Sequence, residues 1–315
     1  MITIPVVDLA DFTSVEAEKK KNFVQKLGKA FEEVGFVAVK NHGIPDDLID
    51  KLYKNVQQFF SLPSEKKKSF EIPELAGQRG YTSFGKEHAK GSDAPDLKEF
   101  FQYGQIVPDD HQLKSEYPDN VKVSDLKEFD ETFFKAYRAF ERSGKFLLQA
   151  IALYLGLDEN YFDNYVEEGN SIVRAIHYPP ITNEPKSAIR AEQHEDINLI
   201  TLLVGASADG LQILTKKNDW VGVTSLPDQI VVNVGDMLQR LTNNKLKSTT
   251  HRVVNPPSEL WHTSRFSIPF FLHPKSSMSL AALSSCIDSK HEKDYKDITA
   301  GEYLDERLRE IGLKK

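Results

Sequence analysis

Cysteine is almost absent from this chain, which has a single thiol, Cys286, among its 315 residues. One thiol cannot form an internal disulfide, and it cannot build the cysteine clusters that hold structural zinc or iron–sulfur centres. Any metal that the chain binds must therefore be held by histidine and carboxylate side chains.

Long apolar runs and an excess of positive charge are also missing. No segment approaches the roughly 20 apolar residues that span a bilayer, and the N-terminus shows no basic stretch followed by an apolar run. We therefore expect a soluble, cytoplasmic protein with no membrane partner. Because 40 lysines and arginines face 47 acidic residues, with a net charge of −7 and a pI near 5.8, a nucleic-acid partner is also disfavoured.

The residues that are present suffice for a globular core, since 40% are hydrophobic and 28% charged. The first 160 residues are expected to be mostly helical. Thr13 and Glu16 have capping-box spacing before a helix that ends at Gly35, and a second amphipathic helix is expected over residues 45–60. The longest periodic stretch, residues 125–155, carries an aromatic stripe that we expect to lie in the core.

From about residue 171 the pattern changes to short, β-branched apolar runs separated by turn residues. Such runs predict a mainly β fold with helices, with a barrel or sandwich of the jelly-roll kind at its centre. Thr299 and Glu302 repeat the capping-box spacing before a C-terminal helix. We expect a helix-rich region, residues 1–160, packed on a β core with its C-terminal helix, residues 161–315.

Two histidines and one carboxylate are the candidate metal ligands. Only one of the nine histidines, His194, has a carboxylate two positions later, Asp196, and about 1.3 such pairs are expected by chance. Two positions apart on a strand share a face, and the apolar run that follows predicts burial of the pair. His251 opens another short apolar strand. The three could form the facial triad of non-haem Fe(II) oxygenases; a zinc hydrolase and a purely structural cluster are the alternatives.

Arg265 and Ser267 share a face of a later predicted strand, RFSIPFF. An arginine offers a carboxylate two parallel hydrogen bonds, and a serine hydroxyl adds another donor. A buried arginine among these phenylalanines is costly without an anionic partner, and no acidic residue is obviously assigned to it. A bound carboxylate ligand explains the pair better than a strand-edge arginine in solvent, and it favours the oxygenase.

Nine segments occur in the order of one known family: IPVVDL, GFVAVKNHGIP, FFSLPSEKK, HYPP, HEDINLITLL, GLQI, VVNVGDML, STTHRVV and RFSIPFF. Over nearly its whole length the chain resembles the isopenicillin N synthase-like, 2-oxoglutarate-dependent Fe(II) oxygenases. The resemblance implies a double-stranded β-helix core with helices packed around it. It also implies the residue roles: the family's iron ligands match His194, Asp196 and His251, and its 2-oxoglutarate contacts match Arg265, Ser267 and Tyr178.

The activity implied by this resemblance uses Fe(II), 2-oxoglutarate and dioxygen. Oxidative decarboxylation of 2-oxoglutarate to succinate and CO2 would be coupled to hydroxylation, desaturation or cyclisation of a small-molecule substrate. One alternative is a member of the same family that oxidises or cyclises its substrate without 2-oxoglutarate. Another is a non-catalytic protein that binds a small acid.

The chain departs from the family at a few positions. Ile176 stands where plant members often have an asparagine, and the loop between His251 and Arg265 is longer than in many of them. Gln78 and Thr82 stand where isopenicillin N synthase would have an arginine and a tyrosine, which disfavours that particular activity. We expect substrate contacts from residues 77–88, from the C-terminal helix, and from three aromatic residues, Phe100, Phe101 and Tyr103.

Overall fold

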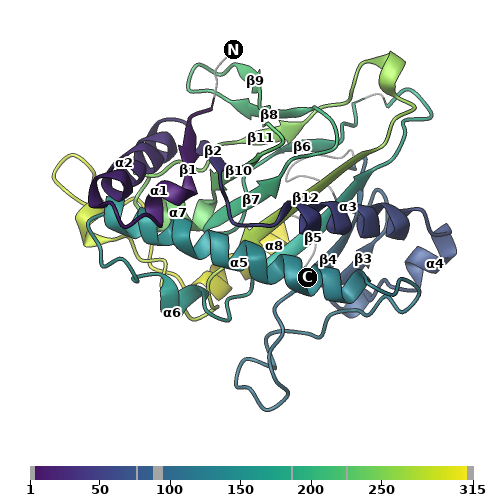
Figure 1. The fold of residues 1–315 in the computed structure, drawn as a ribbon, viewed down its shortest axis with the longest axis horizontal. Coiled ribbons are helices and arrows are strands. Elements are labelled where there is room, and N and C mark those ends of the chain that lie inside the picture. Colours follow the sequence, from purple (N-terminus) through teal and green to yellow (C-terminus); the bar gives the residue numbers. More distant parts are fainter. Residues whose placement is uncertain (1–3, 76, 88–94, 186, 225, 311–315) are drawn as a thin grey trace.

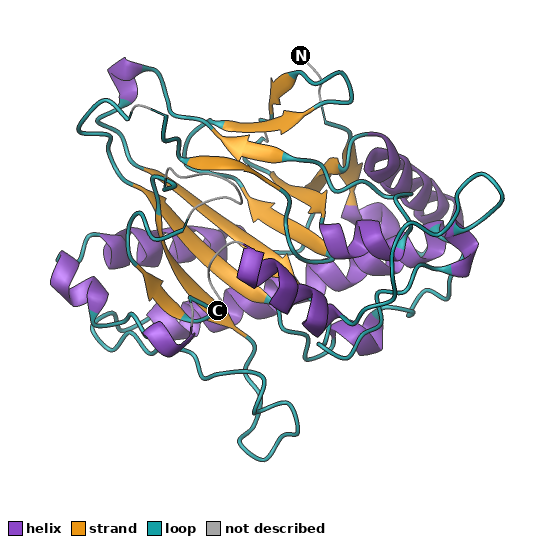
Figure 2. Cartoon of the chain, turned by 180° about the vertical axis from the view of Figure 1, so that it is seen from behind, coloured by secondary structure: helices purple, strands orange, loops and turns teal. Residues whose placement is uncertain are grey.

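A computed structural model describes residues 4–75, 77–87, 95–185, 187–224 and 226–310 of the chain. Two sheets form its centre, with most of the helices outside them (Figures 1 and 2). The larger sheet has eight strands, in the order β1 (Val6–Asp8), β2 (Phe36–Lys40), β10 (Gln229–Val234), β7 (Ile200–Val204), β12 (Arg265–Leu272), β5 (Ile172–Tyr178), β4 (Glu99–Gly104) and β3 (Gly80–Thr82). The smaller sheet has the order β6 (Ala191–His194), β11 (His251–Val253), β8 (Leu211–Leu214) and β9 (Trp220–Gly222).

These two sheets form the double-stranded β-helix that the family resemblance implies. Strand pairs are antiparallel except for β1 with β2. All of the apolar runs noted after residue 171 form strands, as predicted. The first 160 residues, expected to be mostly helical, also supply β1 to β4, so both parts of the chain contribute to the larger sheet.

Helices cover the outer face of the larger sheet. The longest, α5 (Phe129–Tyr154), crosses the strands, with α2 (Ala17–Glu33) and α3 (Asp46–Phe60) packed against it (Figure 1). The shorter helices are α1 (Leu9–Phe12), α4 (Ser64–Lys68), α6 (Asp163–Val166), α7 (Asp236–Leu241) and the C-terminal α8 (Ala300–Glu310). In the described residues no helix is long and apolar enough to cross a membrane.

Helix ends show where local sequence rules held and where they failed. At α8, Thr299 and Glu302 form the expected reciprocal capping box, each side chain bonding the backbone N–H of the other. The capping box expected at Thr13 and Glu16 is wrong: Thr13 ends α1, and α2 starts at Ala17 after Glu16. The additional short helix α1 is capped by the Asp8 carboxylate and ends just before Thr13, which therefore closes one helix and does not open the next.

The aromatic stripe of α5 forms the centre of the core, as predicted. Phe129 and Phe133 are stacked with ring centroids 4.5 Å apart, and both contact Phe101 of β4 edge-on. All three side chains are fully buried. Because α5 also packs on β5, β7 and β12, this cluster fixes the helix against the strands that bear the candidate site.

Phe133→Ala should lower the free energy of unfolding by about 3–5 kcal/mol, since it leaves a cavity among rings that cannot close around it. The adjacent Phe134 is 41% exposed, so Phe134→Ala should change that free energy by about 0.5 kcal/mol or less. Chemical denaturation monitored by circular dichroism measures both. Equal losses in the two variants would contradict this packing.

Candidate metal centre and its two cavities

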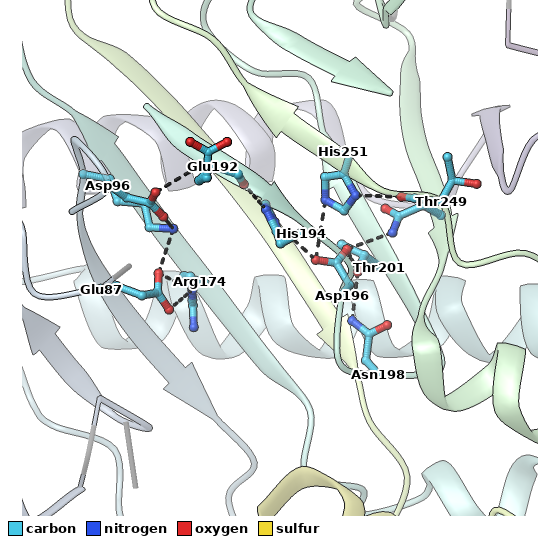
Figure 3. A network of polar contacts seen from close by, with 12 residues as sticks. Glu87, Asp96, Arg174, Glu192, His194, Asp196, Asn198, Thr201, Thr249 and His251 are labelled. Carbon is cyan, nitrogen blue, oxygen red and sulfur yellow. Dashed lines mark hydrogen bonds and ion pairs between the residues drawn. The ribbon is translucent and has the colours of Figure 1, made fainter. Parts of the chain in front are cut away.

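Three side chains converge at one end of the β-helix. His194 ends β6 and His251 begins β11, and the two residues are direct partners in the antiparallel register. Asp196 lies in the loop that follows β6, with its Oδ1 atom 3.9 Å from Nε2 of His194 and 3.6 Å from Nε2 of His251 (Figure 3). In the described part of the chain this is the one group of three such residues whose ligand atoms lie within 4.8 Å of one another.

The expected route to this convergence needs a correction. The HED segment was expected to place His194 and Asp196 on one face of a single strand, but β6 stops at His194. The chain turns there, and the Asp196 carbonyl accepts a hydrogen bond of 2.9 Å from the backbone N–H of Asp236 at the start of α7. The predicted proximity of the pair is right, but a turn produces it instead of strand periodicity.

Both imidazoles are oriented by backbone carbonyls two residues earlier. Nδ1 of His194 lies 2.7 Å from the Glu192 carbonyl oxygen, and Nδ1 of His251 lies 3.1 Å from that of Thr249. A carbonyl can only accept, so the proton of each neutral ring is on Nδ1. The lone pair of each Nε2 therefore faces the Asp196 carboxylate, as metal ligation requires.

The two oxygens of Asp196 have different surroundings. Oδ2 accepts hydrogen bonds from the Thr201 hydroxyl at 2.6 Å and from the Asn233 amide at 2.8 Å. Oδ1 remains directed at the histidines. Burial alone would raise the pKa of this carboxyl, but the two histidines and the two hydrogen bonds outweigh burial and lower it.

The His194 imidazole is uncharged at neutral pH. Burial, followed by the neighbouring His251 ring, lowers its pKa to about 4. A neutral imidazole is the form that binds a metal ion. Two imidazole nitrogens and one carboxylate oxygen are the donor set of a non-haem Fe(II) site, which leaves positions of the ion open to other ligands.

A narrow cavity of about 80 Å³ leads from this cluster to Arg265. Arg265 is 1% exposed; its Nε donates to the Ala208 carbonyl at 3.0 Å, and its Nη1 is buried without a partner. Among the described residues, no carboxylate forms an ion pair with Arg265. Ser267 and Tyr178 line the same cavity, with the Tyr178 ring 5.0 Å from the guanidinium carbon. The structure thus brings Arg265, Ser267 and Tyr178 together, as the sequence suggested.

A wider chamber of about 620 Å³ opens on the other side of the cluster, and His194 and Asp196 line both spaces. Tyr303, Leu304, Arg307 and Leu308 of α8 form part of its wall, as expected for the C-terminal helix. In Figure 2, α8 lies on the side of the sheet opposite α5. Tyr303 donates to Asp236 at 2.8 Å, which ties α8 to α7.

Of the other residues expected to contact substrate, some line the chamber and others lie in the core. Gln78 lines the chamber, whereas Phe101 and Tyr103 pack against the aromatic side of α5. Phe100 lies against Ile176 and Tyr178, next to the narrow cavity. The last residue of the expected segment, His88, lies outside the described residues.

A buried charge network beside the chamber was not anticipated. Lys98 contacts Glu87 at 2.7 Å and Asp96 at 2.8 Å, and Arg174 contacts Glu87 at 3.2 Å (Figure 3). The backbone N–H of Glu192 donates to Asp96 at 2.9 Å, which links this network to the strand of His194. Arg174 is 87 residues from Glu87 along the chain, so no local sequence pattern could have revealed the pair.

The fold and the site together define a non-haem metal oxygenase, and comparison with known proteins gives the family. One family model, the non-haem dioxygenase in morphine synthesis N-terminal region, matches residues 4–124, and the 2OG-Fe(II) oxygenase superfamily matches residues 169–274. The chain is 31% identical over 307 residues to the 2-oxoglutarate-Fe(II) type oxidoreductase hxnY of Emericella nidulans, covering 94% of this chain and 86% of that protein. It is 32% identical over 316 residues to the proline hydroxylase buaE of Petromyces alliaceus, covering 96% and 97%.

Solved structures agree. A 2OG-Fe(II) oxygenase family protein from Caulobacter crescentus superposes with a TM-score of 0.89 at 39% identity, covering 99% of this chain and all of that one. A full-length protein from Neurospora crassa, solved in complex with alpha-KG and thymine, gives a TM-score of 0.85 at 31% identity, covering 97% and 96%. The chain belongs to the 2OG-Fe(II) oxygenase superfamily. It is a 2-oxoglutarate-dependent dioxygenase that uses Fe(II) and dioxygen to oxidise a small-molecule substrate, and its relatives do not favour an oxidase that works without 2-oxoglutarate.

Thr201→Val should weaken metal binding by about 10- to 100-fold, because Asp196 loses the hydrogen bond that directs its second oxygen away from the histidines. Titration of the metal-free protein with Co(II), followed by absorption, measures the affinity. Thr242→Val is the control: the Thr242 hydroxyl is also buried, but it bonds the Leu238 carbonyl on α7, so stability should fall while Co(II) affinity stays. Unchanged affinity in Thr201→Val would contradict the orienting role.

Proposed function

We propose that His194, Asp196 and His251 hold the Fe(II) ion and that Arg265, Ser267 and Tyr178 bind 2-oxoglutarate. The observation that carries the proposal is that the two ends of the narrow cavity each present groups without a partner. At one end, Arg265 has a buried guanidinium nitrogen with no partner, and at the other end three ligand atoms converge. A dicarboxylate with a keto group at one end fits both ends of the cavity. One carboxylate would pair with the Arg265 guanidinium, and the keto acid would ligate the metal.

The side chains around the cavity also support this orientation of 2-oxoglutarate. Tyr178 pairs directly with Arg265 between β5 and β12, and Ser267 pairs with Ile176. The guanidinium and two hydroxyl groups can all donate to one carboxylate. Ile176 and the neighbouring Leu203 and Val253 give the cavity an apolar wall that fits the methylene groups between the carboxylates.

When bound at this site, iron supplies the activation of dioxygen that couples decarboxylation of 2-oxoglutarate to oxidation of the substrate. The residues of the chain hold and orient the reactants. His194 and Asp196 face both spaces, so a substrate in the wide chamber reaches the metal from one side and the co-substrate reaches it from the other.

Two broader assignments accompany the site. We propose that residues 161–315 act as the catalytic core, with residues 1–160 as the region that packs on it and supplies part of the chamber wall. Because the chain has a single cysteine, its fold needs no disulfide, and we propose a cytoplasmic location, where thiols stay reduced. The acidic composition supports small molecules, and not nucleic acids, as partners.

Anaerobic protein loaded with Fe(II) and 2-oxoglutarate should show the weak visible charge-transfer band of the chelated keto acid, and oxygen should then yield succinate. His194→Ala should show no band at any 2-oxoglutarate concentration. Arg265→Ala should need at least about 30-fold more 2-oxoglutarate to reach half of the full band. This factor corresponds to the loss of about 2 kcal/mol, as expected when one partner of a buried charge pair is removed.

Arg252→Ala is the matched control, because Arg252 lies on β11 next to His251 but is stacked on Trp220 and lines neither cavity. It should keep the wild-type titration. A wild-type protein without the band would refute the assignment of both ligand sets, and an Arg265→Ala titration equal to that of wild type would refute the role of Arg265.

A further inference from the structure

Arg174 of β5 lies where the two spaces meet, since it lines both of them together with His194 and Asp196. A substrate must place its reacting atom at this junction. The Arg174 side chain is 16% exposed, so it faces the chamber while most of its length is buried. None of the roles assigned above to the metal and to 2-oxoglutarate involves it.

The guanidinium of Arg174 is fixed on three sides. Its Nε donates to Oε1 of Gln102 at 3.0 Å, from the residue directly opposite on β4, and its Nη1 donates to Glu87 at 3.2 Å. The rings of Phe100 and Phe271 lie 4.3 Å and 5.3 Å from its central carbon. Its Nη2 donates to none of the described residues. Figure 3 shows Arg174 held beside Glu87. A rigid guanidinium that lines both spaces thus keeps one nitrogen without a partner among the described residues.

The acceptor atoms around this donor are already engaged. The two oxygens of Glu87 accept from Arg174 and Lys98, and those of Asp96 accept from Lys98 and from the Glu192 backbone N–H. The Gln102 carbonyl oxygen accepts from Arg174. This part of the wall therefore has a hydrogen bond to donate to a ligand, while its carboxylates are occupied internally.

The charges of the network cancel, since two cations face two carboxylates. Burial opposes the ionisation of Glu87, but Lys98 and Arg174 outweigh it and hold its pKa well below its usual range. The pKa of Lys98 is raised by Glu87 and Asp96 despite its burial. Glu87 and Asp96 therefore already balance the two cations, so an ionised carboxylate added at this junction would have no spare positive charge to meet it.

We propose that Arg174 anchors the oxidised substrate and selects a neutral molecule that presents a carbonyl oxygen, such as an amide. The carbonyl accepts from Nη2 of Arg174, and the molecule extends past Phe271 toward the metal. This assignment rests on the proposed function, because the metal and co-substrate ligands define where the junction is.

The test uses two neutral carbonyl probes, 2-pyridone and δ-valerolactam, and two rings of similar size without an acceptor, toluene and cyclohexane. Saturation-transfer NMR with the full-length, metal-free protein measures binding. The carbonyl probes should bind wild type, and the rings without an acceptor should bind at least about tenfold more weakly, because a hydrogen bond to a charged donor is lost.

Arg174→Met should weaken binding of the carbonyl probes by about tenfold or more. Because this change also leaves Glu87 without one cation, Arg174→Lys is the second variant: it keeps a charge for Glu87 but has no second nitrogen to donate, and it should show the same loss. Arg252→Met is the matched control, since Arg252 likewise bonds a glutamine oxygen at 3.0 Å and packs on an aromatic ring, and it should bind the probes as wild type does.

The Fe(II) and 2-oxoglutarate charge-transfer band, recorded for each variant, separates the two proposals. With the band intact, three results overturn the role of Arg174: equal binding of the carbonyl probes and the plain rings, no binding of either carbonyl probe to wild type, or wild-type binding in both Arg174 variants. A wild-type protein without the band overturns the site assignment on which this inference rests.

Discussion

The Asp196 carboxylate joins the two sheets of the β-helix at the candidate site. Its Oδ2 is held by Thr201 of β7 and Asn233 of β10, which are neighbours in the larger sheet. Its Oδ1 faces His194 of β6 and His251 of β11, which are neighbours in the smaller sheet. A metal bound there would connect the sheets through one side chain. The pairing of β10 with β7 and of β6 with β11 must therefore both be in register for the ligand atoms to meet.

Burial of charge explains much of the remaining polar structure. Glu99 of β4 is nearly fully buried. Its carboxylate accepts hydrogen bonds from Lys67 at 2.7 Å and from the Tyr81 hydroxyl, and it lies 2.7 Å from Nδ1 of His177. Each of these contacts comes from a different element, so the network ties α4, β3 and β5 to β4. An isolated carboxylate there would cost several kcal/mol, which makes the position of this edge of the sheet depend on its polar partners as well as on the aromatic core.

The same networks mark the limit of prediction from sequence. Strands β7, β10 and β12 could be predicted because their residues are mostly apolar and β-branched or aromatic, and because the two polar exceptions in β12, Arg265 and Ser267, share a face. Strand β4 could not, since Glu99 and Gln102 interrupt its apolar pattern and their partners are distant in the chain. The metal cluster was accessible through residue chemistry and a family resemblance. Arg174 was not, because its role depends on Glu87 and Phe271, which only the folded chain brings together.

The two spaces beside the metal cluster differ in electrostatic character, and this difference can keep co-substrate and substrate apart. Arg265 ends the narrow cavity, and a second buried arginine, Arg190, lies near it; burial and then Arg265 lower the pKa of Arg190. Neither has a carboxylate partner among the described residues, so this end is cationic. The network of Arg174 on the chamber side is neutral. If the two ligands bind as proposed, a dianion would be stabilised in the narrow cavity and a neutral molecule in the chamber, although the chain as a whole carries a charge of −7. In that arrangement local desolvated charge, and not the overall field, would direct each ligand to its own space.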